Sequence, residues 1–84
     1  MPTPETIHIK IQTRQEIIYE GDVLSVSSKN DTGPFDILPE HANFISIVKD
    51  QIVLRFPNKQ QQQFRLQTGI LQVEEGRVNV YIES

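Results

Sequence analysis

The sequence predicts an all-β fold, a two-sheet β-sandwich of roughly ten short strands. Its apolar residues recur mainly with a period of two, which is the period of a half-buried strand. Turn signals separate these runs at short, fairly regular intervals, as a sandwich or barrel requires. No stretch shows a convincing amphipathic helix. With 84 residues, the chain is long enough for one domain, residues 1–84.

Four runs alternate clearly: IHIKIQ from Ile7, IVLRF from Ile52, FRLQ from Phe64 and RVNVYI from Arg77. The segment HANFISIVKD, which begins at His41, also tolerates a helical pattern. Its β-branched residues favour a strand, because branched side chains pack well on a pleated surface. We therefore expect a strand here as well.

Four segments carry turn signals between the runs: Glu20–Asp22, Lys49–Gln51, Pro57–Lys59 and Glu74–Arg77. Two of them contain glycines suited to a positive φ angle, and the Pro57–Lys59 segment fits a hairpin turn. Each of the four is predicted to reverse the chain.

Three further features carry local predictions. The Gly33–Pro34 pair indicates a tight reversal, because the residue before a proline avoids the α region. Gly69 predicts a bulge or a close approach of two backbones. The four glutamines Gln60–Gln63 are a possible aggregation-prone tract, but a polar outward edge leading into the strand at Phe64 is the better interpretation.

Charge and composition exclude several function classes. Eight Lys and Arg residues against eleven Asp and Glu give a net charge of −3, and the basic residues are scattered. A nucleic-acid partner is therefore not expected, since such binding needs clustered positive charge. No apolar run approaches the ~18 residues of a membrane span, and the start MPTPET lacks the features of a secretory signal. Any membrane association is expected to come through a partner.

The two histidines do not indicate a catalytic, metal or cofactor site. His41 directly follows Glu40, but neighbours on an extended chain point to opposite faces. His8 lies far away in sequence, and the chain has no cysteine. We expect His41 to pair with main-chain groups of a turn or to lie at an interface. An enzyme or carbohydrate-binding sandwich remains an alternative, although the absence of tryptophan disfavours it.

Three motifs occur in a specific order: IYEGDVLSV, then TGPFDILPEHANF, then LQTGILQVEEGRVNVY. Together they resemble the amino-terminal β-sandwich domain of the F-type ATP synthase epsilon subunit, and the resemblance extends from Ile7 to about Ile82. The segment ILPEHA at Ile37–Ala42 is its most specific part.

The chain departs from the family pattern at several positions. Asp36, Glu40 and Ile70 stand where the family commonly has glycine, Asn43 where it has proline, and Pro34 where it has a polar residue. Typical members also continue into a two-helix carboxy-terminal domain. This sequence stops where the sandwich ends, so we expect no such domain in it.

The resemblance implies a non-catalytic rotor subunit of the central stalk, without a cofactor. In that role the domain, present as a single copy, braces the gamma subunit on the c-ring and couples ion-driven rotation to ATP synthesis. The implied location is the cytoplasmic face of the inner (plasma) membrane, as a peripheral part of the synthase. The alternative is a free-standing epsilon-like module that binds proteins outside a synthase.

The resemblance also implies a partner interface. In the family, the segment equivalent to Lys29–Pro34 and the turn near Pro39–Ala42 lie toward the c-ring and gamma. The family often has a small hydroxyl residue near gamma at two further positions, which are Thr13 and Ser46 in this chain. The implied interface residues are Thr13, Asp31, Thr32, Gly33, Pro34, Glu40, His41, Ala42 and Ser46.

Two further expectations concern side chains around this interface. Asp31, Asp36 and Glu40 are expected to form a local acidic group that complements basic side chains of a partner. The apolar residues between them have a different expected role. Phe35, Ile37 and Leu38 are predicted to serve the domain core, and Phe44 either the core or the interface.

Overall fold

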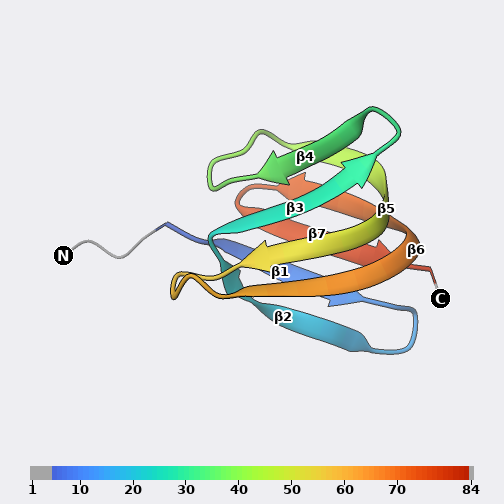
Figure 1. Cartoon of the computed structure of the whole chain (residues 1–84), viewed down its shortest axis with the longest axis horizontal. Coiled ribbons are helices and arrows are strands. Elements are labelled where there is room, and N and C mark those ends of the chain that lie inside the picture. The colour runs from blue at the N-terminus through green and yellow to red at the C-terminus, as the bar shows by residue number, and fades with distance from the viewer. Residues whose placement is uncertain (1–4, 84) are drawn as a thin grey trace.

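Figure 1 shows the computed structural model of the chain, which describes residues 5–83 and builds them from strands, turns and loops without a helix. Seven strands form one continuous hydrogen-bonded sheet in the order β2-β1-β7-β6-β5-β3-β4. All neighbouring pairs are antiparallel except β1 and β7, which are parallel. The strands are β1 (Ile7–Gln12), β2 (Ile17–Val23), β3 (Ser25–Asn30), β4 (Gly33–Ile37), β5 (Phe44–Arg55), β6 (Gln61–Glu74) and β7 (Arg77–Ile82).

The sheet folds over itself into two layers because β5 and β6 are long and strongly curved (Figure 1). The first half of β5 and the second half of β6 pair with each other and, through β7 and β1, continue to β2. The second half of β5 pairs with the first half of β6 and with β3, which pairs with β4. We call the layer that contains β2, β1 and β7 the first layer and the layer that contains β3 and β4 the second layer.

The predicted two-layer sandwich is therefore confirmed, although its layers belong to one sheet. The first layer holds five strand segments and the second holds four, slightly fewer than the expected ten. The seven strands are fewer than predicted in part because turns were expected at Glu20–Asp22 and Lys49–Gln51, where β2 and β5 in fact continue.

At Lys49 and Asp50, β5 bends from one layer into the other opposite a bulge in β6. The pairing shifts between Lys49 and Asp50, so that Gln67 of β6 has no partner in β5. Asp50 has a φ angle of 72°, in the left-handed region, as expected for a residue that re-aims a strand. An ion pair between Asp50 and Lys29 of β3 holds the bend and lowers the pKa of the Asp50 carboxyl group, chiefly through their hydrogen bond.

Gly69 lies in β6 beside this bend, where the prediction of a close backbone approach is confirmed. A methyl group on Gly69 would come within 2.9 Å of both the main-chain oxygen of Tyr81 and a methyl group of Leu66. Only glycine lets β7 pair with β6 at the point where β6 changes layer.

Two predicted hairpin turns are also confirmed. Pro57–Lys59 joins β5 to β6, with Lys59 at a φ angle of 71°. Glu75 and Gly76 join β6 to β7, and both have positive φ angles, as the favoured two-residue hairpin turn requires. The turn predicted at Glu20–Asp22 is wrong, because these residues belong to β2 and pair with β1.

The core lies between the layers and is filled by the inward-facing residues of every strand. Ile9, Ile11 and Val80 of the first layer and Val26 and Leu54 of the second are fully buried. Burying one such side chain stabilises the fold by about 1.5–3 kcal/mol. The complete set is Ile7, Ile9, Ile11, Val23, Val26, Ile37, Val48, Ile52, Leu54, Leu66, Leu71, Val73, Val78 and Val80.

Aromatic side chains close both sides of the sandwich. Tyr19 of β2 contacts Phe56 and Phe64 of the opposite layer, with ring centroids 6.1 and 5.9 Å apart. On the other side, the rings of Phe35 in β4 and Phe44 in β5 meet edge to face at 5.4 Å. These pairs join edges of the two layers that share no ladder of hydrogen bonds, and so stiffen the domain.

Candidate partner-binding surface

The outer face of the first layer carries an exposed apolar patch. Ile47, Ile70 and Tyr81 are paired side by side on β5, β6 and β7, and they are 65%, 46% and 48% exposed. Ile45 lies two residues before Ile47 on the same face of β5 and is 67% exposed. These four residues are the apolar patch, and a contiguous exposed group of this kind typically marks an interaction surface.

A shallow hollow borders the apolar patch. Ile47, Ile70 and Tyr81 line it together with Ile82, and Arg14 and Glu83 add charged groups. An apolar centre with charged residues at its margin is the usual arrangement of a protein–protein interface.

The same face becomes polar with distance from the patch. The next row across the strands pairs Gln72 with Asn79 and Asn79 with Lys10. The row after that pairs Arg77 with both Glu74 and His8. A partner that lies flat on this face would therefore meet apolar groups at one end and charges at the other.

His8 anchors the charged end. Its Nε2 atom lies 2.8 Å from a carboxylate oxygen of Glu20, and its Nδ1 atom lies 3.0 Å from one of Asp22, both on β2. These hydrogen bonds, that to Glu20 above all, raise the pKa of the His8 ring. The same bond lowers the pKa of the Glu20 carboxyl group.

The outer face of the second layer is different, because its polar side chains bind one another. Arg55 Nη1 donates a hydrogen bond to Ser27 Oγ at 2.6 Å, and Ser27 Oγ in turn donates to the carboxylate of Asp36. Gln63 donates to the side-chain oxygen of Gln51. No large apolar side chain of β3, β4 or the second half of β5 is among the exposed ones of the described residues.

The predicted interface residue Thr13 lies in the turn between β1 and β2, just after the strand that borders the apolar patch. Its Oγ1 atom accepts hydrogen bonds from the main-chain N–H groups of Gln15 and Glu16, each at 3.2 Å. Thr13 therefore shapes the turn, and the turn presents Arg14 beside the patch.

Asp31 and Thr32 form the tight reversal between β3 and β4, two residues before the predicted Gly33–Pro34, which instead begin β4. Asn30 organises the turn, since its side-chain oxygen accepts from the N–H groups of Thr32 at 2.9 Å and Gly33 at 3.2 Å. Its amide nitrogen donates to the hydroxyl of the predicted residue Ser46 at 3.0 Å. The structure thus brings Ser46 of β5 to the β3–β4 turn.

Glu40, His41 and Ala42 lie in the loop between β4 and β5. Glu40 has a φ angle of 69°, a left-handed conformation that favours the glycine found here in the family pattern. The His41 ring donates from Nδ1 to the Ala42 carbonyl at 2.7 Å and meets the Phe44 ring at a centroid distance of 5.6 Å. The expectation that His41 pairs with main-chain groups of a turn is confirmed.

The structure does not gather the three acids into one group. Asp31 binds Lys49 at 3.0 Å, and Asp36 accepts from Ser27. Glu40 follows the far end of β4, and a strand of five residues separates it from the β3–β4 turn by roughly 13 Å or more. The expected local acidic group is therefore wrong.

The prediction for the apolar residues of this segment holds in part. Ile37 is buried, and Phe35 and Phe44 pack against the core. Leu38 does not serve the core, because it lies in the loop after β4 and is 56% exposed.

Sequence reasoning did not assign a role to the apolar patch. The missed signal is the pair of apolar residues at successive positions, as in Phe44–Ile45, Ile47–Val48 and Ile70–Leu71. Adjacent residues of a strand face opposite sides, so such pairs mark strands that are apolar on both faces.

The model of one protein family, described as ATP synthase, Delta/Epsilon chain, beta-sandwich domain, matches residues 6–84. The chain belongs to this family. Its match to the beta-sandwich domain agrees with the all-β architecture of two packed layers, and the resemblance of the motifs around Ile37–Ala42 is confirmed.

Relatives of this epsilon-type domain are named ATP synthase epsilon chain. The one from a Nitratiruptor species is 28% identical over 80 residues, which are 94% of this chain and 62% of the relative. The one from Campylobacter curvus is 32% identical over 75 residues, which are 88% of this chain and 58% of the relative. The chain therefore spans about three fifths of the length of these relatives.

Solved structures share the fold at low sequence identity. A chain in the cryo-EM structure of the Euglena gracilis mitochondrial ATP synthase, OSCP/F1/c-ring in rotational state 1, superposes with a TM-score of 0.87 at 15% identity, covering 98% of this chain and 53% of that one. A chain in the central stalk/c-ring structure of the Tetrahymena thermophila mitochondrial ATP synthase gives 0.78 at 10% identity, with coverages of 99% and 67%. Among residues 5–83, no helix is long and apolar enough to cross a membrane.

Proposed function

We propose that this epsilon-type domain is a non-catalytic part of the rotor of an F-type ATP synthase. It braces the gamma subunit on the c-ring, and so helps to couple ion-driven rotation to ATP synthesis. It sits at the cytoplasmic face of the membrane and is held there only by its partners. The observation that carries the proposal is the apolar patch, which the domain exposes on a rigid two-layer body.

The apolar patch is the proposed contact with gamma. Ile45, Ile47, Ile70 and Tyr81 add nothing to the buried core, and covering them with a partner removes their apolar surface from water. Arg14 of the β1–β2 turn borders this surface, and the predicted residue Thr13 shapes that turn through its hydrogen bonds.

The turn at Asp31–Pro34 is the proposed contact with the loops of the c-ring. Asn30 and the Asp31–Lys49 ion pair hold it in place. The loop at Glu40–Ala42 lies at the other end of β4, so it is the proposed contact with a second surface of the stalk. Exposed charges at such sites add orientation and association rate more than affinity.

The proposed bracing role requires that the domain resist deformation, and it requires no catalytic chemistry. Close packing of the core, the aromatic contacts that join the layers and the Asp50–Lys29 ion pair at the bend all resist deformation. A torque applied at the β3–β4 turn is then carried to the apolar patch without local rearrangement.

Co-purification tests the proposal. A tagged copy of the chain, expressed in its own cells, is expected to recover the gamma subunit and the c-ring after mild detergent extraction. Ile70→Asp is expected to reduce this recovery more than tenfold, because an unpaired charge would be buried at the contact. Gln51→Asp, on the outer face of the second layer, is the matched control and is expected to retain recovery.

Two outcomes would contradict the proposal. Equal recovery with Ile70→Asp and Gln51→Asp would exclude the apolar patch as the contact. Recovery of an unrelated protein without gamma would instead favour a free-standing binding module.

Charge reversal of Asp31 and Glu40 to Lys is expected to weaken recovery in a salt-dependent way, since both carboxylates are exposed.

A further inference from the structure

The first half of β6 is an open edge of the second layer. Residues 61–66 pair with β5 on one side, and β7 begins to pair with the other side of β6 only at Gly69. Within residues 5–83, no strand pairs with the outer side of residues 61–67. In Figure 1 this part of β6, in orange, runs beside β5 in the front layer.

The hairpin turn fixes which main-chain groups point outward from this edge. The Phe56 N–H donates to the Gln60 carbonyl at 2.9 Å, so Phe56 and Gln60 form a hydrogen-bonded pair. Such pairs alternate along an antiparallel ladder. Residues 62, 64 and 66 therefore bond to β5, and Gln61, Gln63 and Arg65 direct their N–H and C=O groups to the open side.

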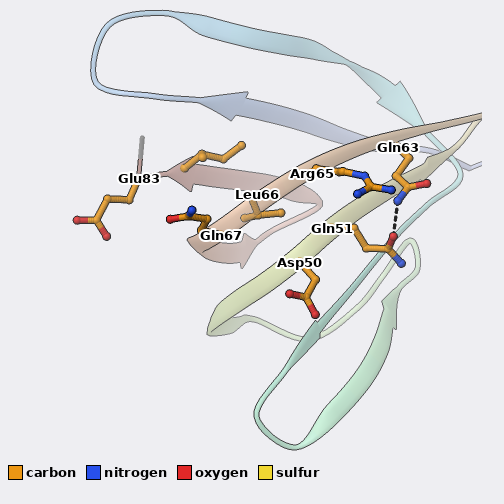
Figure 2. Close-up of a pocket in the computed structure, with 8 residues that line it drawn as sticks. Asp50, Gln51, Gln63, Arg65, Leu66, Gln67 and Glu83 are labelled. Carbon is orange, nitrogen blue, oxygen red and sulfur yellow. Dashed lines mark hydrogen bonds between the residues drawn. The ribbon is translucent and has the colours of Figure 1, made fainter.

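The side chains of this edge alternate as well. Phe64 and Leu66 face the core, while Gln61, Gln63, Arg65 and Gln67 are exposed. A hollow lies along the edge, with Gln63, Arg65 and Leu66 among the residues that line it, and Figure 2 shows Arg65 and Gln63 next to each other. Arg65 forms no ion pair with any described residue.

Natural edge strands are commonly protected by proline, lysine or a bulge that turns the edge away. Between residues 61 and 66 this edge has no proline, no lysine and no register shift. Its single charge is Arg65, which leaves the row of main-chain groups free to pair with another strand.

We propose that this edge, residues 61–67 of β6, binds an extended strand of a partner polypeptide that places an acidic side chain opposite Arg65. The added strand takes the N–H and C=O groups of Gln63 and Arg65 as its hydrogen-bond partners. Its outward side chains are polar and its inward ones are apolar, so that they extend the apolar layer beside Phe64. The edge lies in the second layer, and its hollow adjoins the hollow of the apolar patch at Ile82 and Glu83.

A second copy of the chain is a poorer occupant in the register that pairs the whole edge and in the one centred on Arg65. Antiparallel pairing of two β6 edges about Phe64 would place the two Arg65 side chains diagonally, and pairing about Arg65 would place them directly opposite each other. Like charges at cross-strand positions are destabilising. A partner strand with a glutamate or aspartate at this position gains from the same contact.

Amide hydrogen exchange of the full chain tests the proposal. The probe is a capped seven-residue peptide. Its central residue is glutamate, a valine stands on each side of it, and the two outer positions at each end are threonine and serine. Its binding is expected to slow the exchange of the Gln63 and Arg65 amides at least fivefold. A peptide with a central lysine is expected to bind about fivefold more weakly, and Arg65→Glu is expected to reverse this preference.

A pair of proline variants separates the edge from the rest of the strand. Gln63→Pro removes an outward N–H group and is expected to fold normally but to lose peptide binding. Gln62→Pro removes an N–H group that bonds to β5, and it is expected to destabilise the domain. Should Gln63→Pro fail to fold, the peptide preference of Arg65→Glu still tests whether the edge binds the added strand.

The proposal is overturned if millimolar peptide leaves the Gln63 and Arg65 amides unprotected, or if Gln63→Pro binds as well as the original chain. It also fails if the peptide instead protects the amides of Ile47, Ile70 and Tyr81. Protection of the Gln63 and Arg65 amides by self-association, without peptide, would overturn it as well. None of these results affects the recovery of gamma, so the rotor proposal is judged separately.

Discussion

The two layers of the sandwich share one core but present opposite outer faces. In the first layer, the apolar side chains of Ile47 and Ile70 project into solvent and remain exposed. In the second layer, Ser27, Asp36 and Arg55 satisfy one another through hydrogen bonds. Inward-facing residues therefore build this fold, whereas the outward ones determine which face is held by its own hydrogen bonds and which leaves apolar surface exposed.

The largest expected effect concerns the shared core. Leu71→Ala in the first layer and Leu54→Ala in the second remove fully buried side chains, so each is expected to lower the free energy of unfolding by about 2–5 kcal/mol. Urea denaturation followed by circular dichroism measures both. A loss below about 1 kcal/mol for only one variant would show that its layer contributes little to the fold.

A smaller effect is expected where the strand passes between the layers. Gly69→Ala places a methyl group only 2.9 Å from the main-chain oxygen of Tyr81, so one of the two strands must shift. The expected cost is about 1–3 kcal/mol in the free energy of unfolding. Thr68→Ala, at the exposed neighbour, is the control and is expected to change it by less than about 0.5 kcal/mol. Equal effects would mean that the bend tolerates a side chain.

Still smaller changes in stability are expected on the outer face of the first layer. Ile47→Thr and Ile70→Thr are each expected to alter the free energy of unfolding by less than about 0.5 kcal/mol, because both side chains are exposed. They are expected to reduce the fluorescence of a hydrophobic dye bound to the protein. A large loss of stability would show that the apolar patch belongs to the fold and not to an interface.

The smallest effect is a pH dependence confined to the first layer. Because Glu20 and Asp22 raise the pKa of His8 above its ordinary 6.5, their contribution to stability is full below pH 6.5 and is lost as the pH rises through the raised pKa. The lowered pKa of Glu20 adds stability above its ordinary 4.5 that is lost on acidification. Lys10 and Arg77 also face this cluster, Lys10 on the same strand and Arg77 paired with His8 from β7.

His8→Gln is the variant that isolates this pH dependence. The stability difference between the original chain and His8→Gln is expected to be greatest between about pH 4.5 and 6.5 and to shrink toward pH 8, as measured by urea denaturation at each pH. A difference that grows above pH 7 would show that the neutral ring, not the charged one, is stabilised.

Local alternation and family membership could both be predicted from the amino-acid sequence. Ile7, Ile9 and Ile11 are buried because a strand turns every second side chain to the same side, and this requires no knowledge of its neighbours. The turns at Pro57–Lys59 and Glu75–Gly76 follow from residues that favour them locally. The motif at Ile37–Ala42 is enough to indicate an epsilon-type domain.

Strand neighbours and the points where strands change layer could be learned only from the folded chain. Ile47, Ile70 and Tyr81 form one row only because β5, β6 and β7 pair in that register, and register depends on contacts between distant segments. The bend at Asp50 and the open edge at Arg65 arise in the same way. The alternation of apolar residues in the sequence indicates which face of the strand a residue lies on. Only the pairing between strands determines which residues lie beside it.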